Sequence, residues 1–102
     1  MTTQPNLDDF AKMADSVDEE LYGTKSNEVL FKHLHEEIDE LKKELDAGVC
    51  TDAETRFEQL KELGDVLFCI VSIARQNQMN MAHALSLTIT KLQERIKFNI
   101  RE

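Results

Sequence analysis

Apolar side chains recur every three or four residues in four stretches of the chain, at about residues 7–21, 26–47, 51–76 and 81–96. This spacing is the period of an amphipathic helix with one apolar stripe. Residues that interrupt helices are scarce, with 3 Gly and 1 Pro in 102 residues. The pattern predicts an all-α fold of four helices in a single domain, residues 1–102. The clearest stripes are Phe10, Met13, Ala14, Val17 and Leu21 in the first stretch, Leu34, Ile38, Leu41 and Leu45 in the second, and Leu85, Ile89, Leu92 and Ile96 in the fourth.

Residues that begin and end helices punctuate these stretches. Ser, Thr, Asn and Asp accept a hydrogen bond from the first turn of a helix, and Gly commonly follows the last turn. We therefore expect N-caps at Asn6, at Ser26 or Asn27, and at Asn80, a capping box opened by Thr51 with Glu54, and a C-cap at Gly48.

The second half of the third helix is apolar on nearly every side, from Val66 to Ala74. A helix on the surface of a small bundle keeps one polar face, so this segment must be covered on more than one side. Few other residues are available in so short a chain, which predicts that a second copy supplies the cover. The alternative is that the first and fourth helices wrap the segment within one subunit.

The formal net charge of −8 argues against nucleic acid or an anionic membrane surface as a partner. A phosphate-bearing substrate would also be repelled unless a divalent cation accompanied it. The N-terminus lacks the basic and apolar regions of a secretory signal, and no stretch is long enough to span a membrane. Cys50, at a predicted turn, and Cys69, in an apolar helix, are too few for a disulfide framework. We expect a cytoplasmic protein.

Acidic residues gather on the second and third helices. Glu37 and Glu40 lie on one flank of the second stripe, and Glu62 and Asp65 share a flank of the third helix. A short turn makes the two helices antiparallel, so the pairs can face each other, and four converging carboxylates repel strongly without a cation. Hard oxygen ligands suit Mg²⁺, for which Mn²⁺ can substitute. Each pair alone is also typical of a solvated helix face. A di-iron site would need a Glu-x-x-His motif, which the sequence lacks.

The arrangement of these acids resembles a known family. Residues 36–40 (EEIDE), followed by 62–68 (ELGDVLF), are similar to the E-E-x-x-E…E-L-G-D signature of the MazG-like all-α nucleoside triphosphate pyrophosphatases. Residues 91–95 (KLQER) resemble the late K-x-x-x-R element of that family. The resemblance implies a helical core that dimerises, often with dimers pairing into tetramers. It also implies an enzyme that uses Mg²⁺ and water to convert a nucleoside triphosphate into a monophosphate and pyrophosphate.

The resemblance assigns Glu37, Glu40, Glu62 and Asp65 as metal ligands. Glu36 and Glu37 become the candidate catalytic residues, because a carboxylate beside the attacking water can act as general base. Which carboxylate does so is left open, and an ordinary surface glutamate remains the alternative for Glu36. Glu62 and Asp65 flank Gly64, whose cost of ~1 kcal/mol in a helix predicts close helix packing or ligand approach there.

Three basic side chains are candidates for binding the substrate. Lys91 and Arg95 are one turn apart and could act together on phosphate oxygens, or could form ion pairs with surface acids. His33 could contact a phosphate or pair with Glu37, one turn away. Apolar residues near the metal helix could frame a nucleobase but are more often core, namely Phe10, Met13 and Phe31.

Three functions remain in competition at this point. The first is a (d)NTP pyrophosphohydrolase that cleans the nucleotide pool as a homodimer or homotetramer. The second is a related all-α enzyme, either dUTPase-like or a phosphoribosyl-ATP pyrophosphohydrolase. The third is a catalytically silent helical dimer that acts as an interaction module, against which the converging like charges argue. The separation of the first two rests on family resemblance alone.

Overall fold

Four helices make up the part of the chain that the computed structural model describes, residues 6–48 and 52–98. They are α1 (Leu7–Tyr22), α2 (Asn27–Asp46), α3 (Ala53–Gln76) and α4 (Met81–Lys97), and these ranges contain no strand. The all-helical prediction is confirmed. The 3.6-residue period and the scarcity of helix-breaking residues are local signals, and tertiary packing did not override them.

Three predicted N-caps are confirmed. Asn6 accepts from the Asp9 amide in a complete capping box, Ser26 accepts from the Val29 amide, and Asn80 accepts from the His83 amide. Each side chain satisfies one amide that the first turn of the helix leaves without a partner.

Two boundaries differ from the prediction. Asp52, one residue later than the expected Thr51, caps α3 by accepting from the Thr55 amide. Thr51 and Cys50 lie outside the described residues. At the end of α2, the C-cap is Ala47, and Gly48 follows it with φ +107°, a conformation that disfavours side chains.

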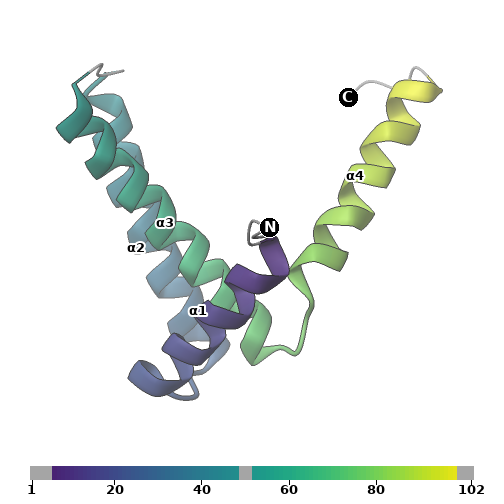
Figure 1. The fold of residues 1–102 in the computed structure, drawn as a ribbon, viewed down its shortest axis with the longest axis horizontal. Helices are drawn as coiled ribbons and strands as arrows, with labels where there is room; N and C mark the ends of the chain where they lie inside the picture. Colours follow the sequence, from purple (N-terminus) through teal and green to yellow (C-terminus); the bar gives the residue numbers. More distant parts are fainter. Residues whose placement is uncertain (1–5, 49–51, 99–102) are drawn as a thin grey trace, which may run out of the picture.

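The helices form a paired hairpin with two outlying helices. α2 and α3 lie side by side along their length, α1 packs against α3, and α4 contacts α1 while running away from the hairpin (Figure 1). Gln78, with φ +55°, lies in the bend between α3 and α4. None of the helices in the described ranges combines the length and apolar character needed to cross a bilayer.

The apolar core of this single chain is small. Leu30, Val66 and Val71 are the buried hydrophobic residues among those described. Most residues of the predicted core stripes face outward instead. Phe10 is 53% exposed, and the following residues are also exposed: Met13, Val17, Leu21, Phe31, Leu85, Ile89, Leu92 and Ile96. So many exposed large side chains are unusual for a monomer.

α1 packs through a face other than its apolar stripe. Its buried residue is Asp18, and Ala11 and Ala14, which precede Asp18 at helical spacing, are half-buried. Small side chains let α1 approach α3 closely, and the Asp18 carboxylate pairs with Arg75 of α3. The choice of face therefore depends on a long-range ion pair, which the period of α1 does not reveal.

The apolar segment 66–74 is only partly covered in one chain. Val66 and Val71 are buried, whereas Leu67 is 49% exposed and Ile70 is 37% exposed. The single-subunit alternative needs α4 to pack along this segment, but α4 diverges from α3 (Figure 1). Cover by a second copy stays a prediction.

Candidate functional site

Three carboxylates converge where the two hairpin helices face each other. Glu37 comes from α2, and Glu62 and Asp65 come from one face of α3, three residues apart. One carboxylate oxygen of each residue lies within 4.8 Å of one from each of the others. Glu37 and Glu62 are half-buried, and Asp65 is exposed. The i, i+3 spacing and the antiparallel hairpin, both predicted, bring these three groups together.

The cluster is electrostatically unfavourable by itself. Burial raises the pKa of Glu37, and the negative charges of Asp65, Glu40 and Glu36 raise it further, while His33 lowers it. Desolvation likewise raises the pKa of Glu62, with Asp65 and Glu37 adding to the effect. Carboxylates that repel one another at this distance fit a hard divalent cation, whose charge would reverse both effects.

Glu40 lies beside this group and outside it. It is exposed and is not among the three carboxylates that share the 4.8 Å limit. Its charge nevertheless raises the pKa of both Glu37 and Glu62, so it lies within electrostatic reach of the cluster. Its role as a fourth ligand stays a prediction.

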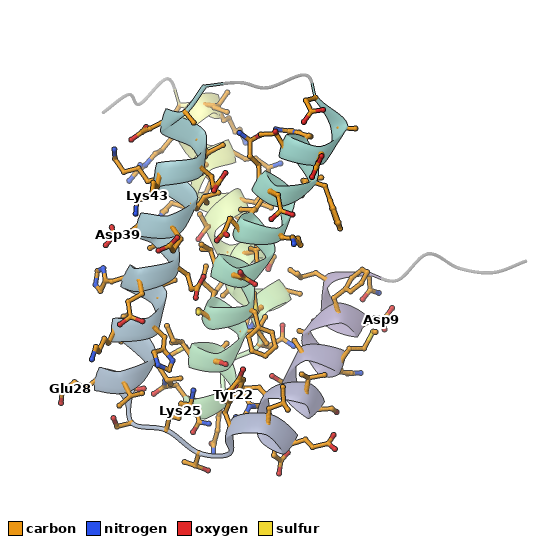
Figure 2. The ribbon with its side chains drawn as sticks, turned by 90° about the vertical axis from the view of Figure 1, so that its left-hand side faces the viewer. Asp9, Tyr22, Lys25, Glu28, Asp39 and Lys43 are labelled. Atoms are coloured by element: carbon orange, nitrogen blue, oxygen red, sulfur yellow. The ribbon has the colours of Figure 1, made fainter. Side chains whose placement is uncertain are left out.

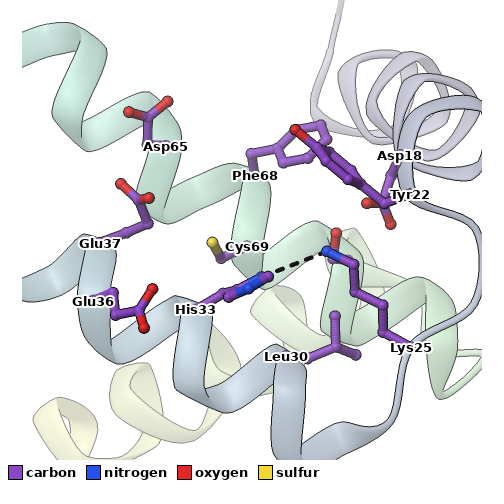
Figure 3. A pocket seen from close by; sticks show the side chains of 11 residues that line it. Asp18, Tyr22, Lys25, Leu30, His33, Glu36, Glu37, Asp65, Phe68 and Cys69 are labelled. Atoms are coloured by element: carbon purple, nitrogen blue, oxygen red, sulfur yellow. Dashed lines mark hydrogen bonds between the residues drawn. The ribbon is translucent and has the colours of Figure 1, made fainter.

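A pocket of about 340 Å³ opens next to the carboxylates. Glu36, Glu37 and Asp65 line one end, and Tyr22 and Lys25 line the other, with Cys69 between them (Figure 3). The volume is within the range of about 300–1,000 Å³ that is typical of small-molecule sites. The pocket is lined by Asp18, Tyr22, Lys25, Leu30, His33, Glu36, Glu37, Asp65, Phe68, Cys69 and Ser72.

Comparison with known proteins gives a family for this arrangement. The MazG nucleotide pyrophosphohydrolase domain matches residues 25–98, which span the helices that carry the acidic cluster and α4. The chain belongs to the MazG family. No curated protein and no solved structure matches the chain. The MazG assignment supports a nucleotide pyrophosphohydrolase in general terms, and the carboxylate cluster suits the divalent-metal dependence of the family.

Glu36 lies closer to the MazG pocket than its position on α2 suggested. The helical wheel places it far from the core stripe, and its side chain is exposed, yet it lines the pocket beside Glu37 (Figure 3). The pocket extends past the edge of the helix interface, so distance from the stripe does not exclude a residue from it.

His33 also lines the pocket, with Lys25 as its hydrogen-bond partner. The Nζ atom of Lys25 lies 3.5 Å from Nδ1 of His33. No ion pair links His33 to Glu37 among the described residues, although the histidine does lower the pKa of Glu37. Contact between His33 and a substrate phosphate stays a prediction.

Lys91 and Arg95 do not reach this pocket within one chain. Both lie on α4, which runs away from the α2–α3 hairpin (Figure 1), and neither lines the pocket. Phe10, Met13 and Phe31 are exposed and do not line it either. In the described single chain, these three residues therefore neither frame the pocket nor form the core that their spacing favoured.

Sequence reasoning missed the residues at the far end of the pocket. Tyr22 and Lys25 flank the turn between α1 and α2 (Figure 2), where no helical period applies. Asp18 and Arg75 hold this turn in place, because Arg75 also donates to the Gly23 carbonyl at 3.0 Å. Spacing alone places Ala11, Ala14 and Asp18 on one face of α1, but it does not show that this face is the one that packs against α3.

Gly64 has open space around it in the single MazG chain. A Cβ atom added there would meet no atom within 4 Å. Close helix packing inside the described chain therefore does not explain this glycine, and approach by a ligand stays a prediction.

Proposed function

We propose that this chain is a Mg²⁺-dependent nucleoside triphosphate pyrophosphohydrolase, which converts (d)NTP into (d)NMP and pyrophosphate and so cleans the nucleotide pool. The observation that carries the proposal is the meeting of Glu37, Glu62 and Asp65 beside a pocket that two of them line. The MazG family match supports the reaction class.

Glu37, Glu62 and Asp65 would hold the metal, with Glu40 joining from the edge of the cluster. All are oxygen donors, and the site is open on the pocket side, which suits Mg²⁺ because this ion keeps several waters and is completed by substrate phosphates. When bound, the ion supplies charge neutralisation for the triphosphate and acidifies a coordinated water.

Glu36 is the better candidate for the general base. It lines the pocket but lies outside the three-carboxylate group, so its carboxylate stays available to accept a proton from the attacking water. Glu37 serves two purposes in this proposal, since it lines the pocket and belongs to the cluster. Its half-buried carboxylate would hold the metal at the end of the pocket.

A second copy of the chain completes the site in our proposal. The single chain buries three hydrophobic residues among those described, too few for a stable fold of this size. The apolar stripe of α4 is exposed in the single chain, and Lys91 and Arg95 lie on the same helix. Packing of this stripe against another copy would bury it and could bring the two cations to a partner's acidic cluster, as a homodimer or a homotetramer.

The deciding experiment is incubation of the protein with each (d)NTP and Mg²⁺, with separate assays for pyrophosphate and orthophosphate. We expect pyrophosphate and (d)NMP from the wild type and almost none from Glu62→Gln. Glu28→Gln is the matched control, because Glu28 is an exposed glutamate on α2 that points away from the hairpin (Figure 2). Release of orthophosphate would instead indicate attack at the terminal phosphorus.

The same assay, extended to phosphoribosyl-ATP as a substrate, separates the alternatives. Turnover of dUTP alone would favour the dUTPase-like enzyme, and turnover of phosphoribosyl-ATP alone would favour that pyrophosphohydrolase. No turnover of any triphosphate would leave the silent helical dimer, in which the carboxylates have no catalytic use.

A further inference from the structure

The far end of the pocket holds a cation that the proposed function has not used. Lys25 is the single Lys or Arg among the described residues that line the pocket. Its side chain is half-buried, and Nζ lies 4.2 Å from the centroid of the Tyr22 ring. An ammonium over an aromatic face is attracted to the ring without losing its charge.

Lys25 also contacts His33. Its Nζ atom lies 3.5 Å from Nδ1 of the imidazole, the contact drawn as a dashed line in Figure 3. A lysine ammonium has three N–H donors. The Tyr22 ring and His33 therefore position the Lys25 side chain and leave N–H groups of the ammonium available to a ligand.

This charge has no anionic partner in the described part of the chain. None of its ion pairs includes Lys25, although Asp18, Glu36 and Glu37 line the same pocket. Asp18 is already paired with Arg75 at 2.6 Å. The protein has a net charge of −8, yet this half-buried lysine lines the pocket and forms no ion pair with a carboxylate. Its charge is therefore available to bind an anion.

The turn that carries Lys25 is held in place. The Gly23 carbonyl accepts one hydrogen bond from Arg75 at 3.0 Å and another from Gln76 at 3.1 Å. Ser26 caps α2 immediately after Lys25. These contacts tie both sides of the turn, so the backbone that carries Lys25 is positioned before any ligand arrives.

We propose that Lys25 binds a phosphate group of the triphosphate, at the end of the pocket away from Glu37 and Asp65. This inference rests on the proposed function. A phosphate fits better than a nucleobase because the ammonium occupies a face of the Tyr22 ring, against which a base would otherwise stack. The unsatisfied N–H groups of Lys25 would donate to phosphate oxygens, and His33 would hold the ammonium in position.

The test measures binding separately from hydrolysis. Calorimetry with Mg²⁺ gives the affinity of inorganic tripolyphosphate, which has no base or sugar, and of a non-hydrolysable nucleoside triphosphate. The proteins are the wild type, Lys25→Met, Lys25→Arg and Lys32→Met. Lys32 is the matched control, since it is an exposed lysine near the start of α2 that does not line the pocket.

We expect Lys25→Met to weaken both ligands about tenfold or more, as the loss of a charge-assisted contact implies, with Lys25→Arg closer to wild type. Lys32→Met should bind both ligands like the wild type. Loss of nucleotide affinity with unchanged tripolyphosphate affinity would overturn the proposal in favour of a base contact. Equal affinities in all four proteins, or no tripolyphosphate binding by the wild type, would also overturn it.

Two further measurements keep the outcomes distinct. Circular dichroism checks that Lys25→Met is folded, and Lys25→Gln replaces it with the same expectations if it is not. A wild type that binds tripolyphosphate through Lys25 but releases no pyrophosphate from any (d)NTP would refute the proposed function and leave the anion site standing.

Discussion

Arg75 donates two hydrogen bonds to the same carboxylate oxygen of Asp18, from Nε at 3.1 Å and from Nη2 at 2.6 Å. The Asp18 side chain is 3% exposed and the Arg75 side chain is 18% exposed, so the pair is largely removed from water. It joins α1 to the end of α3 and, through the Gly23 carbonyl, supports the turn beside the pocket. Removal of one partner would leave the other charge buried and uncompensated.

Replacement of Arg75 by Met should therefore destabilise the fold by about 3 kcal/mol or more. The measurement is urea denaturation of the wild type and the variant at one protein concentration, because association would change the midpoint. Lys42→Met is the matched control, since it breaks the exposed Lys42–Asp46 pair, and we expect it to cost less than about 1 kcal/mol. Equal losses in the two variants would contradict a special role for the buried pair.

Mg²⁺ should stabilise the wild type through the carboxylate cluster. A ligand present at about 100 times its Kd adds about 2.7 kcal/mol when it binds only the native state. Thermal melts with and without Mg²⁺ should show most of this gain lost in Glu62→Gln and reduced in Glu40→Gln. Without metal, both variants should be as stable as the wild type or more so, because each removes repulsion. An equal Mg²⁺ response in Glu28→Gln, Glu62→Gln and the wild type would remove the metal site.

Two inactive variants should complement each other if α4 of one copy supplies its cations to the acidic cluster of another copy. Glu62→Gln and Lys91→Ala should each be nearly inactive, with helical signals intact, and Arg95→Ala should also lower kcat/KM. Co-refolding the first two variants should restore roughly a quarter of wild-type activity, because half of the dimers are mixed and each has one intact site. No recovery, or a folded 11.7 kDa monomer by light scattering, would contradict the shared site.

Gly64→Ala should raise stability and lower activity. Alanine is favoured over glycine inside a helix by about 1 kcal/mol, and the added Cβ meets nothing within 4 Å in the single chain. The methyl group would obstruct the substrate or a second copy beside Asp65. Denaturation and kcat/KM are measured on the same preparation. A variant that is more stable and fully active would show that the glycine has no functional reason.

The charge of Asp52 should make the start of α3 sensitive to acid. The Thr55 amide and hydroxyl hold the pKa of Asp52 below its ordinary value of 3.8. A lowered folded-state pKa contributes stability that is present above 3.8 and lost as pH falls through the folded value. Asp52→Asn keeps an acceptor without the charge, so its loss of stability relative to the wild type should be full near pH ~6 and should shrink as pH falls below 3.8. A gap that persists in acid would indicate a steric cause.

The helices and the acidic cluster were predictable because their signals are local. The 3.6-residue period gives the four helices, and cap residues such as Asn6 and Asn80 satisfy amides three positions away. Glu62 and Asp65 share a face by spacing alone, and the pairing of α2 with α3 then brings Glu37 to them. Each of these inferences needed only one helix or one hairpin.

The other parts of the site depend on contacts far apart in sequence. The packing face of α1 is chosen by Asp18 and Arg75, which are 57 positions apart. Lys25 lies in the turn between α1 and α2, where the hydrophobic period does not predict which way a side chain points. The course of α4 is determined by the bend around Gln78, so the distance of Lys91 from the cluster could not be inferred from the motif.

The divergence of α4 also has a consequence for how the protein behaves on dilution. If the cations on α4 act only in another copy, a dissociated chain is inactive even while it is folded. Specific activity per chain would then fall with protein concentration near the dissociation constant of the assembly, and the rate would rise more steeply than in proportion to the amount of enzyme. In its cell, the protein would be nearly inactive below the concentration at which its copies associate, and its total activity would rise with concentration above it.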